Sequence, residues 1–288
     1  MVENIPSGAQ KDGLNAFERA DHNGFNMAMG SGGIITASHF DDEGIQFDLA
    51  DYEPLIAYGG GIILFGSTEQ GITSLGALAD STETIHYGGL ELSAAEAVRL
   101  FPLEKMGVGD LEPLMGYDGG EAVTAAVMRG ELTVGYSTTG HYLQNVKPLE
   151  ERGDIVPLMV QGYVQDGEVV RDPAFPEVPT MPEAYERLTG QAATGTEWDA
   201  YKAITSAQTN LLRTYWVHGD APADARQALN EAADQLAEDK GFLKAAAKLE
   251  GNEPRPVTGP ELDEALASVR NLPPQEVKWV LDYLARWQ

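Results

Sequence analysis

The sequence predicts an α/β fold with mostly parallel sheets, because short apolar runs alternate with stretches of helical character. The runs expected as strands are residues 25–29, 62–65, 84–87, 132–136, 155–160 and 215–217. The stretches expected as helices are 93–105, 121–129, 142–152, 181–188, 199–212 and 223–237. A length of 288 residues is enough for one large domain or for two lobes of ordinary size.

Two helices have clear start signals, and two show clear apolar stripes. Thr180, Pro182 and Glu183 predict a capping box with a proline in the first turn. Pro222 and Asp224 similarly open the long acidic helix. Apolar stripes that we expect to face a core are formed by Leu229, Ala232, Ala233 and Leu236, and by Val277, Val280, Leu281, Leu284 and Trp287.

The bulk composition excludes several classes of function. The 45 acidic and 19 basic residues give a net charge of −26, which repels phosphate backbones and argues against a nucleic-acid partner. This charge favours a high-salt source, although an ordinary acidic protein is the alternative. The chain has no cysteine, which excludes disulfides and thiolate chemistry. No apolar run approaches the ~20 residues that cross a bilayer, which indicates a soluble chain.

Catalytic and metal-binding signatures are absent from the sequence. It has no Gly-x-Ser-x-Gly, Walker-type or Gly-x-Gly-x-x-Gly motif. The histidines are scattered, and none pairs with another at the spacing of metal ligands. The acidic residues Asp41, Asp42 and Glu43 lack the ligand spacing of a calcium loop, so we expect a solvated turn there. The sequence therefore predicts no catalytic residue, no metal and no cofactor.

Loops rich in glycine, serine and threonine recur where strands are expected to end and helices to begin. Glycine lets the backbone approach a ligand closely, and helix N-termini bind anions through unpaired N–H groups. In open α/β sheets, ligands bind beyond the carboxyl ends of the strands. The loops are residues 7–9, 30–33, 66–68, 88–93, 117–120 and 137–140, and together they predict an anion site.

The order of the motifs resembles the receptors of tripartite tricarboxylate transporters, also called the Bug family, along essentially the whole chain. Residues 2–9, VENIPSGA, are similar to the family's "VENRPGAGG" segment, and residues 21–29 resemble its "PDGYTL" strand entry. Residues 116–132 resemble its "Y-x-G-x-x-x-A…G-E-V-D" block. The most specific match is PEVPTMPEA at 176–184, which is similar to "PDVPTLAEA". The segments 221–251 and 258–262 resemble its C-terminal motifs.

The resemblance implies a two-lobed, type II periplasmic-binding-protein-like fold with a cleft between two α/β lobes. Residues 1–83 plus 218–288 would form lobe 1 and residues 84–217 lobe 2, with crossings near 80–86 and 212–220. It also implies an extracytoplasmic, monomeric receptor that captures a small organic carboxylate and passes it to membrane transporter subunits of the tripartite type. The ligand-binding residues carried over by position are Ser7, Gly8, Ala9, Ser31, Ser67, Thr68, Gly89, Ser93, Tyr117, Gly119, Gly120, Ser137 and Thr138.

Two features depart from the family pattern. The leader, first strand, first glycine loop and first helix of the family have no counterpart here, so we expect an N-terminally truncated chain. Glu91 lies close to the expected anion. We therefore expect either that its side chain points away or that the ligand is less anionic than citrate.

Two other functions stay open. A sensory or partner module could share the fold and signal instead of serving transport. An enzyme on the same scaffold could use Asp118 or Glu121 as a general base, although the sequence offers no nucleophile and base pairing to favour it.

Overall fold

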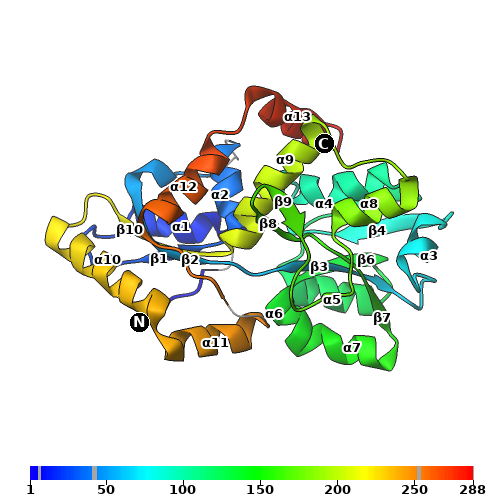
Figure 1. Cartoon of the computed structure of the whole chain (residues 1–288), viewed down its shortest axis with the longest axis horizontal. Helices are drawn as coiled ribbons and strands as arrows, with labels where there is room; N and C mark the ends of the chain where they lie inside the picture. Colours follow the sequence, from blue (N-terminus) through cyan, green and yellow to red (C-terminus); the bar gives the residue numbers. More distant parts are fainter. Residues whose placement is uncertain (6–7, 41–43, 252–253, 288) are drawn as a thin grey trace.

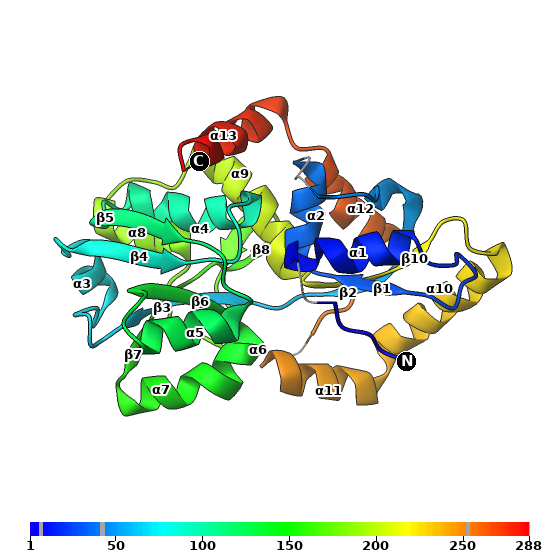
Figure 2. The same ribbon diagram turned by 180° about the vertical axis from the view of Figure 1, so that it is seen from behind.

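The computed structural model shows two lobes side by side, each built around its own sheet (Figures 1 and 2). It describes residues 1–5, 8–40, 44–251 and 254–287, so Ser7 and the acidic turn at Asp41, Asp42 and Glu43 lie outside the described residues. The first lobe has a three-stranded sheet in the order β1 (Ala28–Gly30), β10 (Arg213–His218), β2 (Tyr52–Tyr58). The second has a five-stranded sheet in the order β5 (Asp110–Leu114), β4 (Thr84–Gly88), β6 (Val134–Thr138), β3 (Ile62–Ser67), β7 (Ile155–Val160).

Helices cover both sheets. Around the first are η1 (Gly8–Gln10), α1 (Lys11–Glu18), α2 (Gly32–His39), η2 (Leu49–Asp51), α10 (Ala223–Glu238), α11 (Lys240–Glu250) and α12 (Gly259–Arg270). Around the second are α3 (Leu75–Ala79), α4 (Ala94–Lys105), α5 (Gly120–Met128), α6 (Thr139–His141), the π-helical turn η3 (Tyr142–Val146), α7 (Lys147–Arg152), α8 (Met181–Thr189), α9 (Thr196–Thr205) and α13 (Pro274–Ala285). A second π-helical turn, η4 (Ser206–Asn210), continues α9, and β8 (Tyr163–Gln165) pairs with β9 (Glu168–Val170) as a hairpin.

The α/β class and the two lobes are confirmed, while strand direction differs between the sheets. In the larger sheet β4 runs parallel to β5 and β6, and β3 runs antiparallel to β6 and β7, so four of five strands share a direction. In the smaller sheet both neighbouring pairs are antiparallel. The strands β3 and β10 each enter a sheet directly from the other lobe.

The lobes are joined at a different place from the one predicted. The strands β2 and β3 lie in different sheets and are separated only by Gly59, Gly60 and Gly61, so the first crossing is at 59–61 and not near 80–86. The chain returns through residues 211–212, at the edge of the predicted 212–220. The glycines are sterically required, because a Cβ at Gly61 would lie 1.8 Å from Asp172 Oδ2.

The strand β3 shows why its apolar run has no polar alternation. Ile62 and Leu64 pack into the core beneath α4, α8 and α9, and Ile63 and Phe65 pack against α5 and η3 on the opposite face. All four side chains are buried. A strand covered by helices on both faces has a near-continuous apolar run, as residues 62–65 do here.

The C-terminal stripes are only partly buried, which corrects the prediction. Ala233 of α10 is buried, but Leu236 is 38% exposed. Val280 of α13 is buried, whereas Leu281 is 48% exposed. The helix α13 also packs on the core of the second lobe, beside α4 and α9 (Figure 1), and not on the first lobe as expected for residues 218–288.

Candidate functional site

A cavity of about 310 Å³ lies between the two lobes. Six residues predicted for the ligand site line it: Ser31, Ser93, Gly119, Gly120, Ser137 and Thr138. Polar or charged residues that the sequence did not single out also line it, namely Gln10, Glu96, Arg99, His141, Gln208 and Arg213, as does Glu91. The rest of the wall is mainly apolar and includes Ile34, Ala37, Ile62, Leu90 and Leu212.

Four helices begin at this cavity. Ser31, Ser93, Gly119 and Thr138 are the N-cap residues of α2, α4, α5 and α6, and all four line it. Ser31 and Ser93 make no side-chain capping hydrogen bond, and Gly119 has no side chain to make one, so these residues leave the first-turn amides of α2, α4 and α5 uncapped. Thr138 Oγ1, in contrast, accepts the His141 N–H of α6. Helix N-termini carry a partial positive charge, so the convergence makes the cavity favourable for an anion.

The wall from the first lobe is held by Gln10. Its backbone has a φ of 80°, a left-handed conformation that is unfavourable for a residue with a Cβ. The side-chain amide donates from Nε2 to Ser31 Oγ over 2.7 Å and accepts the Ser31 N–H at Oε1 over 2.8 Å. These two bonds fix the start of α2 against the start of α1, which immediately follows Gln10.

Ser67 and Thr68, also predicted for the ligand site, do not line this cavity. Thr68 Oγ1 donates to the carbonyls of Gly153 and Asp154, and Ser67 N donates to the Thr133 carbonyl. The reason is the direction of β3. Because β3 runs antiparallel to β6, its carboxyl end lies at the opposite edge of the sheet from the carboxyl end of β6.

The remaining predicted residues either do not line the cavity or lie outside the described part of the structure. The amide of Tyr117 donates to the Gly89 carbonyl over 3.3 Å, so these two residues pair with each other. Gly8 precedes α1 with a φ of 61°, and Ala9 belongs to η1, although the Ala9 side chain lies outside the described part of the structure. None of Gly8, Gly89 and Tyr117 is part of the described wall.

A buried ion pair forms the floor. Arg99 and Glu96 of α4 are 4% and 2% exposed, and Arg99 Nη1 lies 2.8 Å from Glu96 Oε1. Burial alone would lower the pKa of Arg99, but the carboxylate of Glu96 raises it above its usual value. The guanidinium lies 4.2 Å from the ring centroid of Tyr136. The hydroxyl of Tyr87 donates to Glu96 Oε2, and burial followed by the charge of Glu96 raises the Tyr87 pKa.

Two glutamines, Gln161 and Gln208, continue the hydrogen bonds of this buried pair. Gln208 of η4 accepts at Oε1 from Arg99 Nη2 over 3.1 Å and from Gln161 Nε2 over 2.9 Å. Gln208 is 1% exposed, and its Nε2 has no hydrogen-bond partner within the described residues. Only the i, i+3 spacing of Glu96 and Arg99 could have indicated this cluster, because its other members come from η4 and from the residue that follows β7.

Glu91 lies in the cavity wall. Its Oε2 lies 3.0 Å from Lys11 Nζ, on the first helix of the other lobe. The negative charge next to the expected anion is therefore balanced by an ammonium.

His141 contributes an imidazole to the wall. Its Nδ1 lies 2.8 Å from Ser137 Oγ, and burial lowers its pKa, an effect that the nearby charge of Glu121 partly offsets. The ring is therefore biased toward its neutral form.

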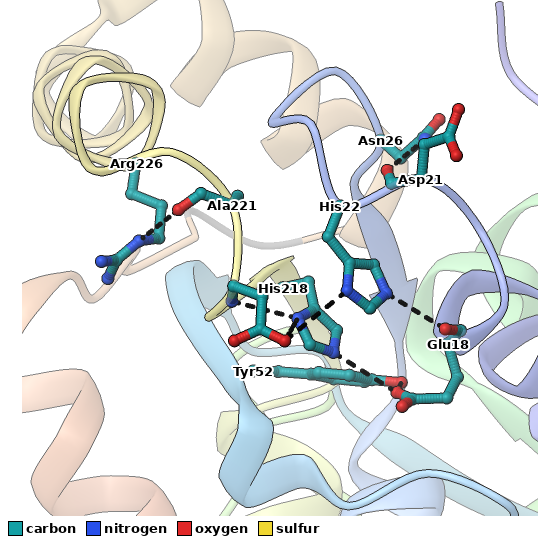
Figure 3. A network of polar contacts seen from close by, with 9 residues as sticks. Glu18, Asp21, His22, Asn26, Tyr52, His218, Ala221 and Arg226 are labelled. Carbon is teal, nitrogen blue, oxygen red and sulfur yellow. Dashed lines mark hydrogen bonds and ion pairs between the residues drawn. The ribbon is translucent and has the colours of Figure 1, made fainter.

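A second polar cluster lies in the first lobe (Figure 3), where the histidines are not scattered as the sequence indicated. The rings of His22 and His218 stack with centroids 3.4 Å apart. Together with Asp220 they offer nitrogen and carboxylate atoms within 4.8 Å of one another. However, an imidazole binds metal in its ring plane, and stacked rings do not share one. Nδ1 of His218 also accepts the Asp220 N–H, so the cluster is not preformed for a metal ion.

Comparison with solved structures shows that the chain shares the two-lobed fold of periplasmic binding proteins. The periplasmic binding protein BugD superposes with a TM-score of 0.71 at 16% identity, covering 98% of this chain and 86% of BugD. Rpa4515 of R. palustris, solved with adipate, gives 0.67 at 18% identity, with 96% and 83% covered. MatC of Rhodopseudomonas palustris, with bound malate, gives 0.60 at 13% identity, with 98% and 84% covered.

These neighbours are binding proteins of the tripartite tricarboxylate transporter type, so the resemblance seen in the sequence is confirmed at the level of the fold. No protein-family model matches the chain, and no curated protein matches it in sequence. Among the described residues, no helix combines the length and the apolar character needed to span a bilayer.

Proposed function

We propose that this protein is an extracytoplasmic receptor that binds a small organic carboxylate and delivers it to a membrane transporter of the tripartite type. The observation that carries the proposal is the convergence of four helix N-caps, Ser31, Ser93, Gly119 and Thr138, on one cavity between two lobes. The bound malate and adipate of two structural neighbours support the same class of ligand.

The protein would be a monomer, and its two lobes would close on the ligand. Residues up to Tyr58 and from Arg213 to Pro273 would form one lobe, and residues from Ile62 to Asn210 with α13 the other. Ser137 Oγ lies 2.8 Å from His141 Nδ1 in the cavity wall, so a hydroxyl and a base are in contact there, and the proposal of binding without turnover rests on the helix N-caps and not on the lack of such a pair. The charge of −26 would slow the capture of an anion at low ionic strength, and added salt would relieve this repulsion.

A thermal-shift experiment tests the proposal. A ligand that binds only the folded state stabilises it by about 2.7 kcal/mol at a hundred times its Kd. We expect the Tm of the purified chain to rise with some members of a panel of mono-, di- and tricarboxylates at millimolar concentration. The corresponding neutral amides serve as controls and should leave Tm unchanged. If no acid in the panel shifts Tm, the chain is not a carboxylate receptor.

A further inference from the structure

We propose that the side-chain amide of Gln208 is the donor that receives the ligand's carboxylate, and that the ligand is a monocarboxylate with an apolar body. The proposal rests on the proposed function and specifies its ligand. It follows from three observations: the fixed orientation of one amide, the pairing of the charges around the cavity, and the apolar character of the remaining wall.

The orientation of the Gln208 amide is fixed by its neighbours. Arg99 Nη2 and Gln161 Nε2 are both donors, and both contact the same oxygen of Gln208. A flipped amide would place its NH₂ group against these two donors, so the nitrogen is held on the other side. That nitrogen is buried without a partner in the described chain. Leaving such a donor unsatisfied is unfavourable, so an acceptor supplied by a ligand would be favoured at this position.

The charges of the described wall balance one another. Glu96 pairs with Arg99, Glu91 with Lys11, and Arg213 Nη2 lies 3.4 Å from Glu250 Oε1. Anion binding must therefore come from neutral donors and helix N-termini, which suit a single carboxylate. A second carboxylate on the same ligand would have no guanidinium or ammonium in the described wall that lacks a counter-charge. In the wall it would also meet the carboxylate of Glu91.

The remaining surface suits an apolar body. Ile34 and Ala37 of α2, Ile62 of β3, and Leu90 and Leu212 line the cavity from both lobes. Burial of apolar ligand surface against these side chains would favour binding. A linear or aromatic acid such as hexanoate or phenylacetate would place its chain or ring against these side chains.

Isothermal titration calorimetry on the full chain tests the proposal with matched ligands. Hexanoate and adipate have the same carbon count and differ by one carboxylate, and phenylacetate controls for body shape. We expect hexanoate or phenylacetate to bind at least tenfold more tightly than adipate. Tighter binding of adipate would overturn the proposal while leaving the receptor function intact. Binding of none of the acids would instead refute the receptor function itself.

The variant Gln208→Glu separates ligand contact from structure. It keeps an oxygen for Arg99 and Gln161 but replaces the free NH₂ by an oxygen that repels a carboxylate. We expect the monocarboxylate Kd to rise at least tenfold while the ligand-free Tm is unchanged or higher. Gln275→Glu, on the exposed first turn of α13, adds the same charge and should bind like the wild type. Wild-type affinity in a folded Gln208→Glu protein would refute the role of the amide. The hexanoate to adipate ratio of the wild type decides the ligand class even if this variant does not fold.

Discussion

Lys11 Nζ and Glu91 Oε2 lie 3.0 Å apart and link α1 of one lobe to the loop after β4 of the other, at the wall of the cavity. The side chain of Lys11 is 10% exposed and that of Glu91 is 32% exposed, so the pair is shielded from water on one side only. It both bridges the lobes and neutralises a negative charge beside the proposed anion site.

Glu91→Gln is therefore expected to tighten carboxylate binding. The substitution removes a negative charge near the ligand, and charges near a protein surface interact by on the order of 1 kcal/mol, which corresponds to about a fivefold change in Kd. Calorimetric titration at low salt measures the change, and the gain should shrink at high salt. Glu168→Gln, on the exposed strand β9, makes the same charge change away from the cavity and should have no effect. Weaker binding by Glu91→Gln would show that the bridge between the lobes matters more than the charge.

Gly32→Ala is expected to destabilise the protein and to weaken ligand binding. A Cβ at Gly32 would lie 2.0 Å from the Ala207 carbonyl oxygen and 2.4 Å from Gln208 Cα, both backbone atoms of η4. Overpacking of this kind costs about 1–3 kcal/mol of unfolding free energy, measurable by denaturant unfolding. Gly76→Ala is the control, because its nearest contact would be 3.7 Å away on an exposed helix. Equal stability of the two variants would contradict the close approach of α2 to η4.

His141 is expected to make the protein less stable at acid pH. Burial lowers its pKa in the folded state, so below the unfolded-state pKa of about 6.5 the unfolded chain binds the proton first. Its contribution therefore falls as the pH drops through that value and levels off below the folded-state pKa. Unfolding free energies measured between pH 8 and 5 should fall less steeply in His141→Asn than in the wild type. Identical slopes would contradict the burial of this imidazole.

Thr180→Ala is expected to cost about 1 kcal/mol of stability, the usual value of an N-cap. The predicted capping box is present: Thr180 Oγ1 accepts the Glu183 N–H over 3.2 Å, and Glu183 Oε2 accepts the Thr180 N–H over 2.8 Å. Thr180→Ser keeps the hydroxyl and should retain most of the stability. Denaturant midpoints compare the two variants, and an equal loss in both would assign the effect to the lost methyl group.

The fold class and the capping box could be predicted because their signals are local. Alternating strand and helix patterns fix the α/β class, and Thr180 with Glu183 is sufficient to predict a helix start. Four of the predicted loop residues, Ser31, Ser93, Gly119 and Thr138, are the N-caps that line the cavity, which is also a local property.

The direction of β3 and the contacts within the site could not be predicted, because they depend on how segments distant in the sequence pack together. Ser67 and Thr68 follow a strand like the other loops do, but the sequence does not reveal that β3 runs against its neighbours. Arg99 and Gln208 are far apart in the chain, and each on its own resembles an ordinary helical residue. The same is true of His22 and His218, which stack only because the first lobe is built from both ends of the chain. Sequence spacing carries no information about such contacts.

The turn η4 both lines the cavity and lies next to the connection between the lobes. It presents Gln208 to the cavity, and it leads within three residues into β10, where the chain passes back to the first lobe. A π-helical turn is a rare and less regular arrangement that recurs at functional positions. A carboxylate bound by this amide would therefore contact the segment that joins the two lobes, so ligand binding and the proposed closure of the lobes would depend on the same short stretch of backbone.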